Sequence, residues 1–406
     1  MKVTYVVPRY GVEVIGGAEL GVRMLAEQLV LAGVEVEVCT TCAVDSDTWA
    51  DSYPPGAEQV NGVLVRRFRS TSGRDPRFDE LSARVLPDAA GASEIVEREW
   101  IERQGPVCPA ALDAAGSSRA QVVIFSPYLF WPSVTGILRF GRRALLHPAT
   151  HEEAPIHLPI FRRVFGSVGA LAFYTEAEQR LTEQLFPAVS ALPQTVIGLG
   201  VVEGAGLPAG ARAAIRVGER PYLLCLGRVD AGKGTVVLRQ FFAAYKQRHP
   251  GPLALVYVGP VVDPLPPHPD VIVTGAVDES VKWGALRGAS VVVSPSTSES
   301  FSLALLEGWT AGRPALVNAA CHATAGHVRA SGGGLCFDSY AAFEVSLERL
   351  LADAALRSAM GSAGRDYVAR RYSWPRLAER YCSFLTGLRV EGANVGVDHH
   401  GDQLGE

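Results

Sequence analysis

Two glutamates near residue 300 have the type and spacing to hold a ligand rich in hydroxyl groups. Glu299 and Glu307 stand eight positions apart, shortly after the apolar run from Val291 to Ser294. Helical periodicity begins at about Ser302, so we expect Glu299 in a loop and Glu307 well inside a helix. The two carboxylates could then bind two parts of one long ligand, with phosphate attracted to the amino end of the helix. The alternative is a carboxylate that favours the helix dipole together with a solvated glutamate.

Two cations lie on a second loop of the same kind. Arg228 and Lys233 stand five positions apart on a glycine-flanked loop that follows the apolar run from Tyr222 to Leu226. Their side chains could neutralise a diphosphate, and the glycines would let the backbone approach its oxygen atoms. The spacing differs from that of a P-loop. A surface loop with two solvated cations is the alternative.

The first half of the chain contributes a glycine pair and a histidine. Gly16 and Gly17 lie between an expected strand and an expected helix, which indicates either close approach of the backbone to a ligand or a tight turn. His151 follows the apolar residues Leu145 and Leu146, so we expect it at the carboxyl edge of a sheet. A solvated loop histidine is the alternative.

Two further patterns favour structural roles. Asp45 and Asp47 match an Asp-x-Asp metal signature, but they lie in a polar connection and are expected to be solvated. Cys39 and Cys42 have a redox or half-zinc spacing without the second pair of ligands that a structural zinc site needs. The glycine segments have no dinucleotide-binding spacing, which disfavours a nicotinamide enzyme.

These candidate residues need a sheet whose strand ends bring them together. Short apolar runs alternate with helical patterns, and runs that are apolar on both faces are typical of buried parallel strands. We therefore predict a doubly wound α/β fold. The predicted strands are Val3 to Val7, Val34 to Cys39, Gly62 to Arg66, Gln121 to Phe125, Tyr222 to Leu226, Ala254 to Val258, Val271 to Thr274 and Ser290 to Ser294.

The strand and helix pattern begins twice, with a segment rich in Gly, Ala and Pro between the two series. The boundary is predicted near residue 205, which gives domains 1–204 and 205–371. Residues 372–390 are predicted as a last helix, because Ser373 precedes Trp and Pro at an early helical position. Residues 391–406 are predicted as a flexible tail.

The composition limits the classes of function. The chain has 406 residues, a formal net charge of −4 and 48% hydrophobic residues, as expected of a folded protein of two or three domains. This net charge gives no long-range electrostatic field that would attract nucleic acid or an anionic membrane. The seven cysteines lie mostly in apolar runs, and neither a signal peptide nor an apolar stretch of about 18 residues is present. We expect a cytoplasmic protein.

Taken in order, the four segments resemble the retaining glycosyltransferases of family four. The resemblance runs from Pro8 to Trp374, and the pair of glutamates separated by seven residues is its most specific element. It implies the GT-B fold, in which two Rossmann-like domains face each other across an active-site cleft. The last helix would then cross back to the first domain.

The resemblance also implies roles in binding a nucleotide-sugar donor. Arg228 and Lys233 would bind the diphosphate, Glu299 the transferred sugar and Glu307 the ribose hydroxyls. Backbone groups would bind the rest of the donor: those of Ser300, Phe301, Ser302 and Leu303 the sugar or phosphate, and that of Val277 the base.

In the first domain, Gly16 and Gly17 match the glycine loop that faces the donor phosphates or the acceptor. His151 matches the histidine near the reacting sugar, although Glu152 follows it where many relatives have Asp. Tyr10 and Tyr128 are predicted to contact the acceptor, with packing at the sheet edge as the alternative.

The resulting hypothesis is an enzyme that transfers a sugar from a UDP- or GDP-sugar with retention, without metal or cofactor. A soluble small acceptor is expected, because the first 200 residues contain a single lysine, Lys2, and their arginines occur in separated groups. Neither nucleic acid nor stable membrane binding is expected. A nucleotide-sugar epimerase of the same fold and a non-catalytic nucleotide-sugar binding protein are the alternatives.

Overall fold

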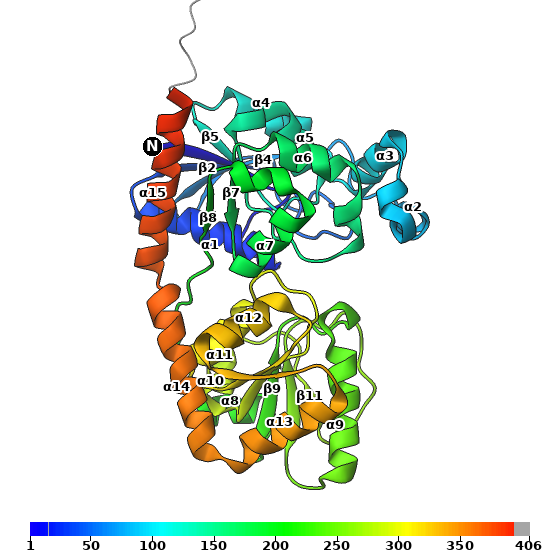
Figure 1. Cartoon of the computed structure of the whole chain (residues 1–406), viewed down its shortest axis with the longest axis vertical. Coiled ribbons are helices and arrows are strands. Elements are labelled where there is room, and N and C mark those ends of the chain that lie inside the picture. Colours follow the sequence, from blue (N-terminus) through cyan, green and yellow to red (C-terminus); the bar gives the residue numbers. More distant parts are fainter. Residues whose placement is uncertain (15, 394–406) are drawn as a thin grey trace, which may run out of the picture. The chain divides into compact units, whose positions relative to one another are not determined.

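The computed structural model describes residues 1–14 and 16–393. Within them the chain forms two compact units, each with its own sheet (Figure 1). The first unit comprises Met1–Tyr174, Glu178–Ile197 and the chain from Leu377 on, and the second comprises Thr175–Ala177 and Gly198–Arg376.

The first unit is built on an eight-stranded sheet with the order β3-β4-β2-β1-β5-β6-β7-β8. Every neighbouring pair is parallel except β3 and β4. The central strands are apolar and buried on both faces, as parallel strands between two helical layers must be. The strands are β1 (Lys2–Val6), β2 (Glu35–Thr41), β3 (Gly56–Val60), β4 (Val63–Phe68), β5 (Val122–Phe125), β6 (Ala144–Leu146), β7 (Ala170–Phe173) and β8 (Gln194–Val196).

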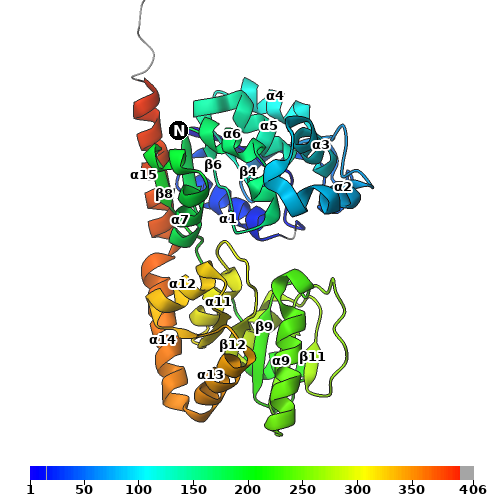
Figure 2. The same ribbon diagram turned by 45° about the vertical axis from the view of Figure 1, so that its right-hand side comes forward.

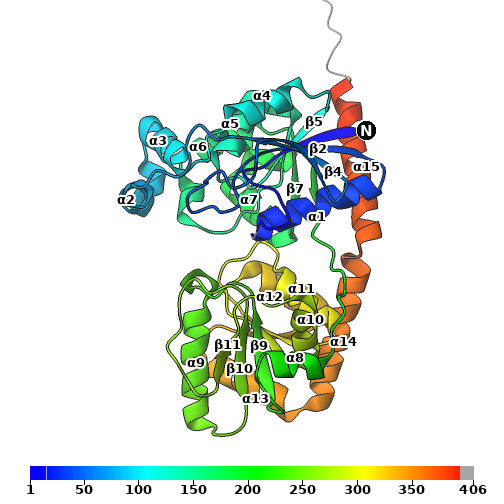
Figure 3. The same ribbon diagram turned by 180° about the vertical axis from the view of Figure 1, so that it is seen from behind.

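Alternate residues of these strands face two different helical layers. Val6, Phe125 and Leu146 pack against the core formed with α2 to α6. On the opposite face, Tyr5 and His147 each contact the hydroxyl of Tyr381 in α15, and α1 lies beside the same sheet (Figure 3). The helices are α1 (Gly17–Leu31), α2 (Phe78–Val85), α3 (Glu94–Gln104), α4 (Pro109–Ser117), α5 (Trp131–Phe140), α6 (Ile160–Ser167), α7 (Glu176–Leu185) and α15 (Trp374–Ala393).

The second unit has a six-stranded, all-parallel sheet with the order β11-β10-β9-β12-β13-β14. This is the doubly wound order in which successive strands are added first on one side of β9 and then on the other. The switch point lies between β9 and β12, which pair through Leu223 and Val291. The strands are β9 (Tyr222–Leu226), β10 (Ala254–Val258), β11 (Val271–Val273), β12 (Val291–Ser294), β13 (Ala315–Asn318) and β14 (Gly334–Phe337).

Helices cover both faces of this second sheet (Figure 2). Leu223 and Val293 pack with α9 and α13, whereas Leu224 and Val292 pack with α8 and α10. The helices are α8 (Pro208–Ala214), α9 (Thr235–Arg248), α10 (Glu279–Gly288), α11 (Leu303–Thr310), α12 (His322–Ser331), α13 (Tyr340–Ala352) and α14 (Ala354–Arg371). Short 3-10 helices complete the described chain: η1 (Leu86–Gly91), η2 (Gly141–Arg143), η3 (Ala154–His157), η4 (Pro187–Ala191) and η5 (Ala231–Lys233).

The predicted α/β class is confirmed, and each of the eight predicted strands is present with small shifts at its ends. A ninth strand, β6, was expected before His151 from Leu145 and Leu146, and it is also present. Five strands were not predicted: β3, β7, β8, β13 and β14. All are five residues or shorter, and β3 is an exposed antiparallel edge strand that lacks the apolar run typical of a buried parallel strand.

The connection between the units belongs to the second unit from Gly198 on, earlier than the predicted boundary near residue 205. Its bare backbone lies against aromatic rings. A Cβ atom on Gly198 would lie 2.5 Å from the ring of Tyr372, and one on Gly200 would lie 2.5 Å from the ring of Trp374. The nearby rings therefore leave no room for a side chain at either position.

The C-terminal helix α15 extends to Ala393, beyond the predicted end at residue 390. It begins at Trp374 with Pro375 in its first turn, as predicted. The rest of the predicted tail, residues 394–406, lies outside the described residues. None of the described helices combines the length and the apolar character that a membrane span requires.

Candidate active site

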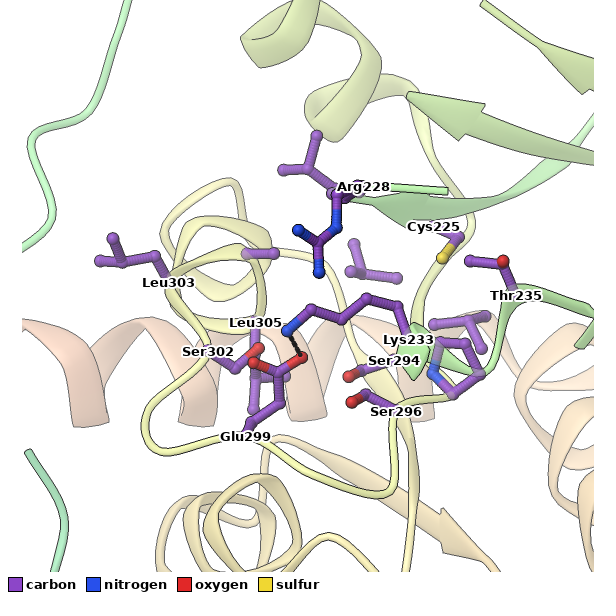
Figure 4. A pocket seen from close by; sticks show the side chains of 16 residues that line it. Cys225, Arg228, Lys233, Thr235, Ser294, Ser296, Glu299, Ser302, Leu303 and Leu305 are labelled. Atoms are coloured by element: carbon purple, nitrogen blue, oxygen red, sulfur yellow. Dashed lines mark hydrogen bonds and ion pairs between the residues drawn. The ribbon is translucent and has the colours of Figure 1, made fainter. Parts of the chain in front are cut away.

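A pocket lies at the switch point of the second sheet, where the loops after β9 and β12 begin. Open α/β sheets bind ligands at this point, because the connections that follow the two adjacent strands run to opposite faces of the sheet and leave a crevice between them. The pocket has a volume of about 140 Å³, which is enough for part of a nucleotide sugar. Its lining includes five of the predicted site residues: Arg228, Lys233, Glu299, Ser302 and Leu303 (Figure 4).

The two cations of this pocket are paired with carboxylates. Lys233 donates from Nζ to Oε1 of Glu299 over 2.8 Å, and the Arg228 guanidinium contacts Asp230. Asp230 also accepts a hydrogen bond from the backbone N–H of Lys233 at 2.8 Å, which fixes the turn between the cations. The side chains of Arg228 and Lys233 remain 56% and 35% exposed. A diphosphate can therefore reach both cations and take the place of the carboxylates.

The amino end of α11 adds backbone donors to the same pocket. Ser302 precedes the helix with φ of 72°, and its side chain makes no capping hydrogen bond. A serine rarely adopts this left-handed conformation, and such strain is common in ligand-binding loops. Leu303 and Ala304, which begin the helix, line the pocket. Uncapped amides and the positive end of the helix dipole favour an anion here.

Glu307 lies one turn along α11 from Leu303, on the same side of the helix. Its Oε1 atom is 2.8 Å from Nζ of Lys282 in α10, which is also 2.8 Å from Oε1 of Glu279. Burial raises the pKa of Glu307, with Lys282 opposing that shift. Burial also lowers the pKa of Lys282, but its two carboxylate neighbours outweigh this and leave it raised. Sequence analysis missed Lys282, for which the only signal is the spacing of three from Glu279.

The other predicted residues of the second unit, Glu307 among them, do not line this pocket. The Phe301 side chain is buried and packs edge-on against His327 and Tyr372, with ring centroids 5.4 and 5.3 Å away. Only its backbone is therefore suited to the predicted ligand contact. Ser300 and Val277 are half-buried, Val277 against the core that includes α10.

In the first unit, the predicted glycine pair begins α1. Gly16 is the residue before the helix and Gly17 is its exposed first residue. Behind Gly16, Nε of Arg9 donates to Oε1 of Glu19 over 2.8 Å, and both side chains are less than a tenth exposed. A Cβ atom on Gly16 would lie 2.2 Å from Oε2 of Glu19. An added Cβ would therefore displace the ends of a buried ion pair, which favours glycine at this position besides any contact with a ligand.

His151 lies after β6, and the carboxylate beside it is that of Glu153. Its Nε2 atom is 3.3 Å from Oε2 of Glu153, whereas Glu152 pairs with His157 over 2.7 Å. The other oxygen of Glu153 accepts a hydrogen bond of 2.7 Å from the Tyr128 hydroxyl. Burial and the Glu153 carboxylate raise the pKa of Tyr128 well above its ordinary value, so this hydroxyl keeps its proton.

Tyr128 and Tyr10 are each only 1% exposed, which matches the alternative that they pack at the sheet edge. The Tyr128 ring packs against Phe161, with centroids 4.8 Å apart. The Tyr10 hydroxyl makes no hydrogen bond within the described part of the chain. Direct contact of either ring with an acceptor stays a prediction.

The two weaker signals have local structural partners. Oδ1 of Asp45 accepts hydrogen bonds from the backbone of Asp47 and from both the backbone and the hydroxyl of Thr48. Cys39 and Cys42 are buried free thiols. In residues 1–14 and 16–393, no three His, Cys, Asp or Glu side chains gather as metal ligands would.

Comparison with known proteins agrees with this geometry. Residues 220–353 match the family model "Glycosyl transferases group 1". The chain is 28% identical over 366 residues to a GDP-mannose-dependent alpha-(1-6)-phosphatidylinositol monomannoside mannosyltransferase of Mycobacterium tuberculosis, a match that covers 83% of this chain and 87% of that protein.

Two solved structures share the fold over nearly the whole chain. A sucrose-phosphate synthase from Thermosynechococcus elongatus superposes with a TM-score of 0.71 at 18% identity, covering 96% of this chain and all of that one. The structure "Trehalose-6-phosphate from E. coli bound with UDP-2-fluoro glucose" superposes with a TM-score of 0.71 at 13% identity, covering 95% and 99%. The resemblance expected from the sequence and the GT-B fold are confirmed.

Proposed function

We propose that this chain, which has the GT-B fold and matches the group 1 glycosyl transferases over residues 220–353, transfers a hexose from a nucleoside-diphosphate sugar to a hydroxyl acceptor with retention at the anomeric carbon. The observation that carries the proposal is the pocket of the second unit. Arg228, Lys233 and the amino end of α11 are directed at one anion site, and Glu299 stands beside them. A diphosphate and a sugar joined to it fit this order of groups.

The chemical problem is the departure of a nucleoside diphosphate that gains negative charge. Arg228, Lys233 and the α11 amides stabilise this charge as the bond between the anomeric carbon and the phosphate oxygen breaks. When the diphosphate takes over Lys233, Glu299 is released to accept hydrogen bonds from sugar hydroxyls. The acceptor oxygen forms its bond to the anomeric carbon from the face that the leaving group vacates, and a phosphate oxygen takes its proton.

For the donor, we propose a GDP-sugar before a UDP-sugar, because the mycobacterial relative is GDP-mannose-dependent. For the acceptor, we propose a soluble small molecule, although that relative acts on a phosphatidylinositol mannoside. Positive charge of the first unit is engaged locally: Arg66 with Glu37 over 3.0 Å and Arg163 with Glu97 over 2.6 Å. Paired arginines attract an anionic lipid surface less than free ones.

The test uses the full chain with GDP- and UDP-sugars, with and without sugar and cyclitol acceptors. A thiol is tested beside them, and transfer to the thiol alone would contradict a hydroxyl acceptor. The proposal is supported if nucleotide is released only in the presence of acceptor and if the product linkage, axial or equatorial, has the same anomeric configuration as the donor. An epimerised donor without acceptor supports an epimerase instead, and binding without turnover supports a binding protein.

A chelator and anionic vesicles test two finer parts of the proposal, which are metal independence and the soluble acceptor. Activity that survives a strong chelator is expected, because side chains and amides neutralise the phosphates. Activity that is lost and then restored by manganese would contradict metal independence. Transfer that requires anionic vesicles would contradict the soluble acceptor and leave the donor pocket unaffected.

A further inference from the structure

Lys282, which the predicted site does not include, holds the carboxylate of Glu307. Its Nζ atom lies 2.8 Å from Oε1 of Glu307 and 2.8 Å from Oε1 of Glu279. The two acidic partners differ in environment, since the side chain of Glu279 is 75% exposed and that of Glu307 is 18% exposed. The ammonium group therefore joins a solvated carboxylate to a largely buried one.

The burial of Glu307 makes this contact necessary. A carboxylate removed from water tends to take up a proton, and the Glu279 charge nearby acts in the same direction. A protonated carboxyl group loses part of its capacity to accept hydrogen bonds, which is the capacity that a pair of ribose hydroxyls needs. Lys282 opposes protonation through both its charge and its hydrogen bond.

The geometry also fixes the direction of the carboxylate. The contact with Lys282 uses Oε1, so the ammonium group orients the carboxyl plane and Oε2 keeps its acceptor capacity. Lys282 is itself held, because the next residue, Trp283, is buried in the core of the second unit. An anchored lysine can hold a glutamate in one orientation at low cost in side-chain entropy.

We propose that Lys282 is a positioning residue that keeps Glu307 ionised and directed at the ribose of the donor. It thereby makes the pocket prefer a nucleoside diphosphate with both ribose hydroxyls over a diphosphate without them. This rests on the proposed function, since it takes Glu307 as the ribose-binding residue.

Calorimetry on the full chain tests this with three probes: GDP or UDP, the corresponding 2′,3′-dideoxy nucleotide, and inorganic pyrophosphate. In Lys282→Met, affinity for the ribose-containing nucleotide should fall by about tenfold or more, as expected for loss of a charge-supported hydrogen bond. Affinity for the dideoxy nucleotide and for pyrophosphate should stay the same. Lys282→Arg should restore most of the affinity, and Glu279→Gln is the matched control that should change it by less than about twofold.

The role through Glu307 has its own readout. In a Glu307→Gln background, the Lys282→Met change should have no further effect on nucleotide affinity, because its target is already neutral. Equal losses for all three probes, or unchanged affinity for the ribose-containing nucleotide, would overturn the proposal. If Lys282→Met does not fold, the comparison of Lys282→Gln with Lys282→Arg decides by the same criteria. Failure of the unaltered chain to bind any of the nucleotides would instead contradict the proposed function.

Discussion

The two units have similar strand order around their switch points but place charge there in opposite ways. In the second unit, the loop after β9 presents Arg228 and Lys233 with side chains 56% and 35% exposed. In the first unit, the loop after β1 contains Arg9, whose side chain is 9% exposed and is bonded to Glu19. One sheet edge exposes its cations to solvent, whereas the other uses charge inside the protein.

The difference shows what an ion pair at a sheet edge can do. An exposed pair contributes little to stability, so its cation can exchange a carboxylate for a phosphate at small cost. A buried pair cannot exchange, because either partner left alone would be a charge without solvent. Arg9 and Glu19 therefore fix the glycine loop, while Arg228 and Lys233 are available for chemistry.

Arg9→Ala should have the largest effect, and that effect should be on stability. Removing one partner of a buried ion pair costs about 3–5 kcal/mol, so the strands of the first unit should exchange their amide hydrogens much faster. Mass spectrometry of hydrogen exchange reports each unit separately. Arg228→Ala should leave exchange in both sheets unchanged, and equal destabilisation by the two variants would remove the contrast.

Lys233→Ala and Arg228→Ala should act on turnover instead. Loss of a hydrogen bond to a charged group costs about 1.5–3 kcal/mol, which corresponds to a fall in kcat/KM of roughly 10- to 150-fold. Steady-state kinetics with the preferred donor measure it. Arg239→Ala, which removes a guanidinium bonded to the carbonyl of Pro266, is the control and should keep near-normal kinetics.

Acid should weaken both units by a similar amount, because each buries a histidine bonded to a tyrosine. Burial lowers the pKa of His147 to about 3 and that of His327 to about 4. Between pH 7.5 and 5.5 the unfolded chain takes up protons that the folded chain does not, so the free energy of unfolding should fall by about 1 kcal/mol for each histidine. Urea unfolding followed at several pH values measures this.

A variant of one histidine provides the control, and the quantity to compare is the slope of the free energy of unfolding against pH. His147→Asn should flatten this slope for the first unit, while the slope for the second unit persists. The comparison does not depend on how much stability the variant loses at neutral pH. An unaltered slope in the first unit would mean that another group titrates there.

Tyr128→Phe should have the smallest effect, on kcat rather than on the KM of the donor. The change keeps the ring but removes the hydrogen bond that holds Glu153 beside His151. A loss of about two- to tenfold is expected for one such bond. Glu152→Gln is the matched control, since Glu152 pairs with His157. A larger effect of Glu152→Gln would contradict the assignment of Glu153 as the carboxylate that acts with His151.

The pocket residues could be predicted because they lie close in sequence to the strands that position them. Arg228 and Glu299 each follow a strong apolar run, and parallel strands bring such loops to one edge. Lys282 could not be predicted in this way. The packing of α10 against α11 brings it to Glu307, and no local sequence pattern indicates that packing. Glu153 was also missed, because no local pattern shows which of two successive glutamates lies beside His151 and which pairs with His157.

The glycine connection that begins at Gly198 also determines how the protein tolerates change. Its sequence reads as a linker, yet a methyl group at Gly198 or Gly200 would collide with the rings of Tyr372 or Trp374. In a saturation mutagenesis library selected for folded protein, these two positions should therefore be depleted as strongly as core positions. Gly210, where an added Cβ would meet nothing within 4 Å, should accept substitutions freely.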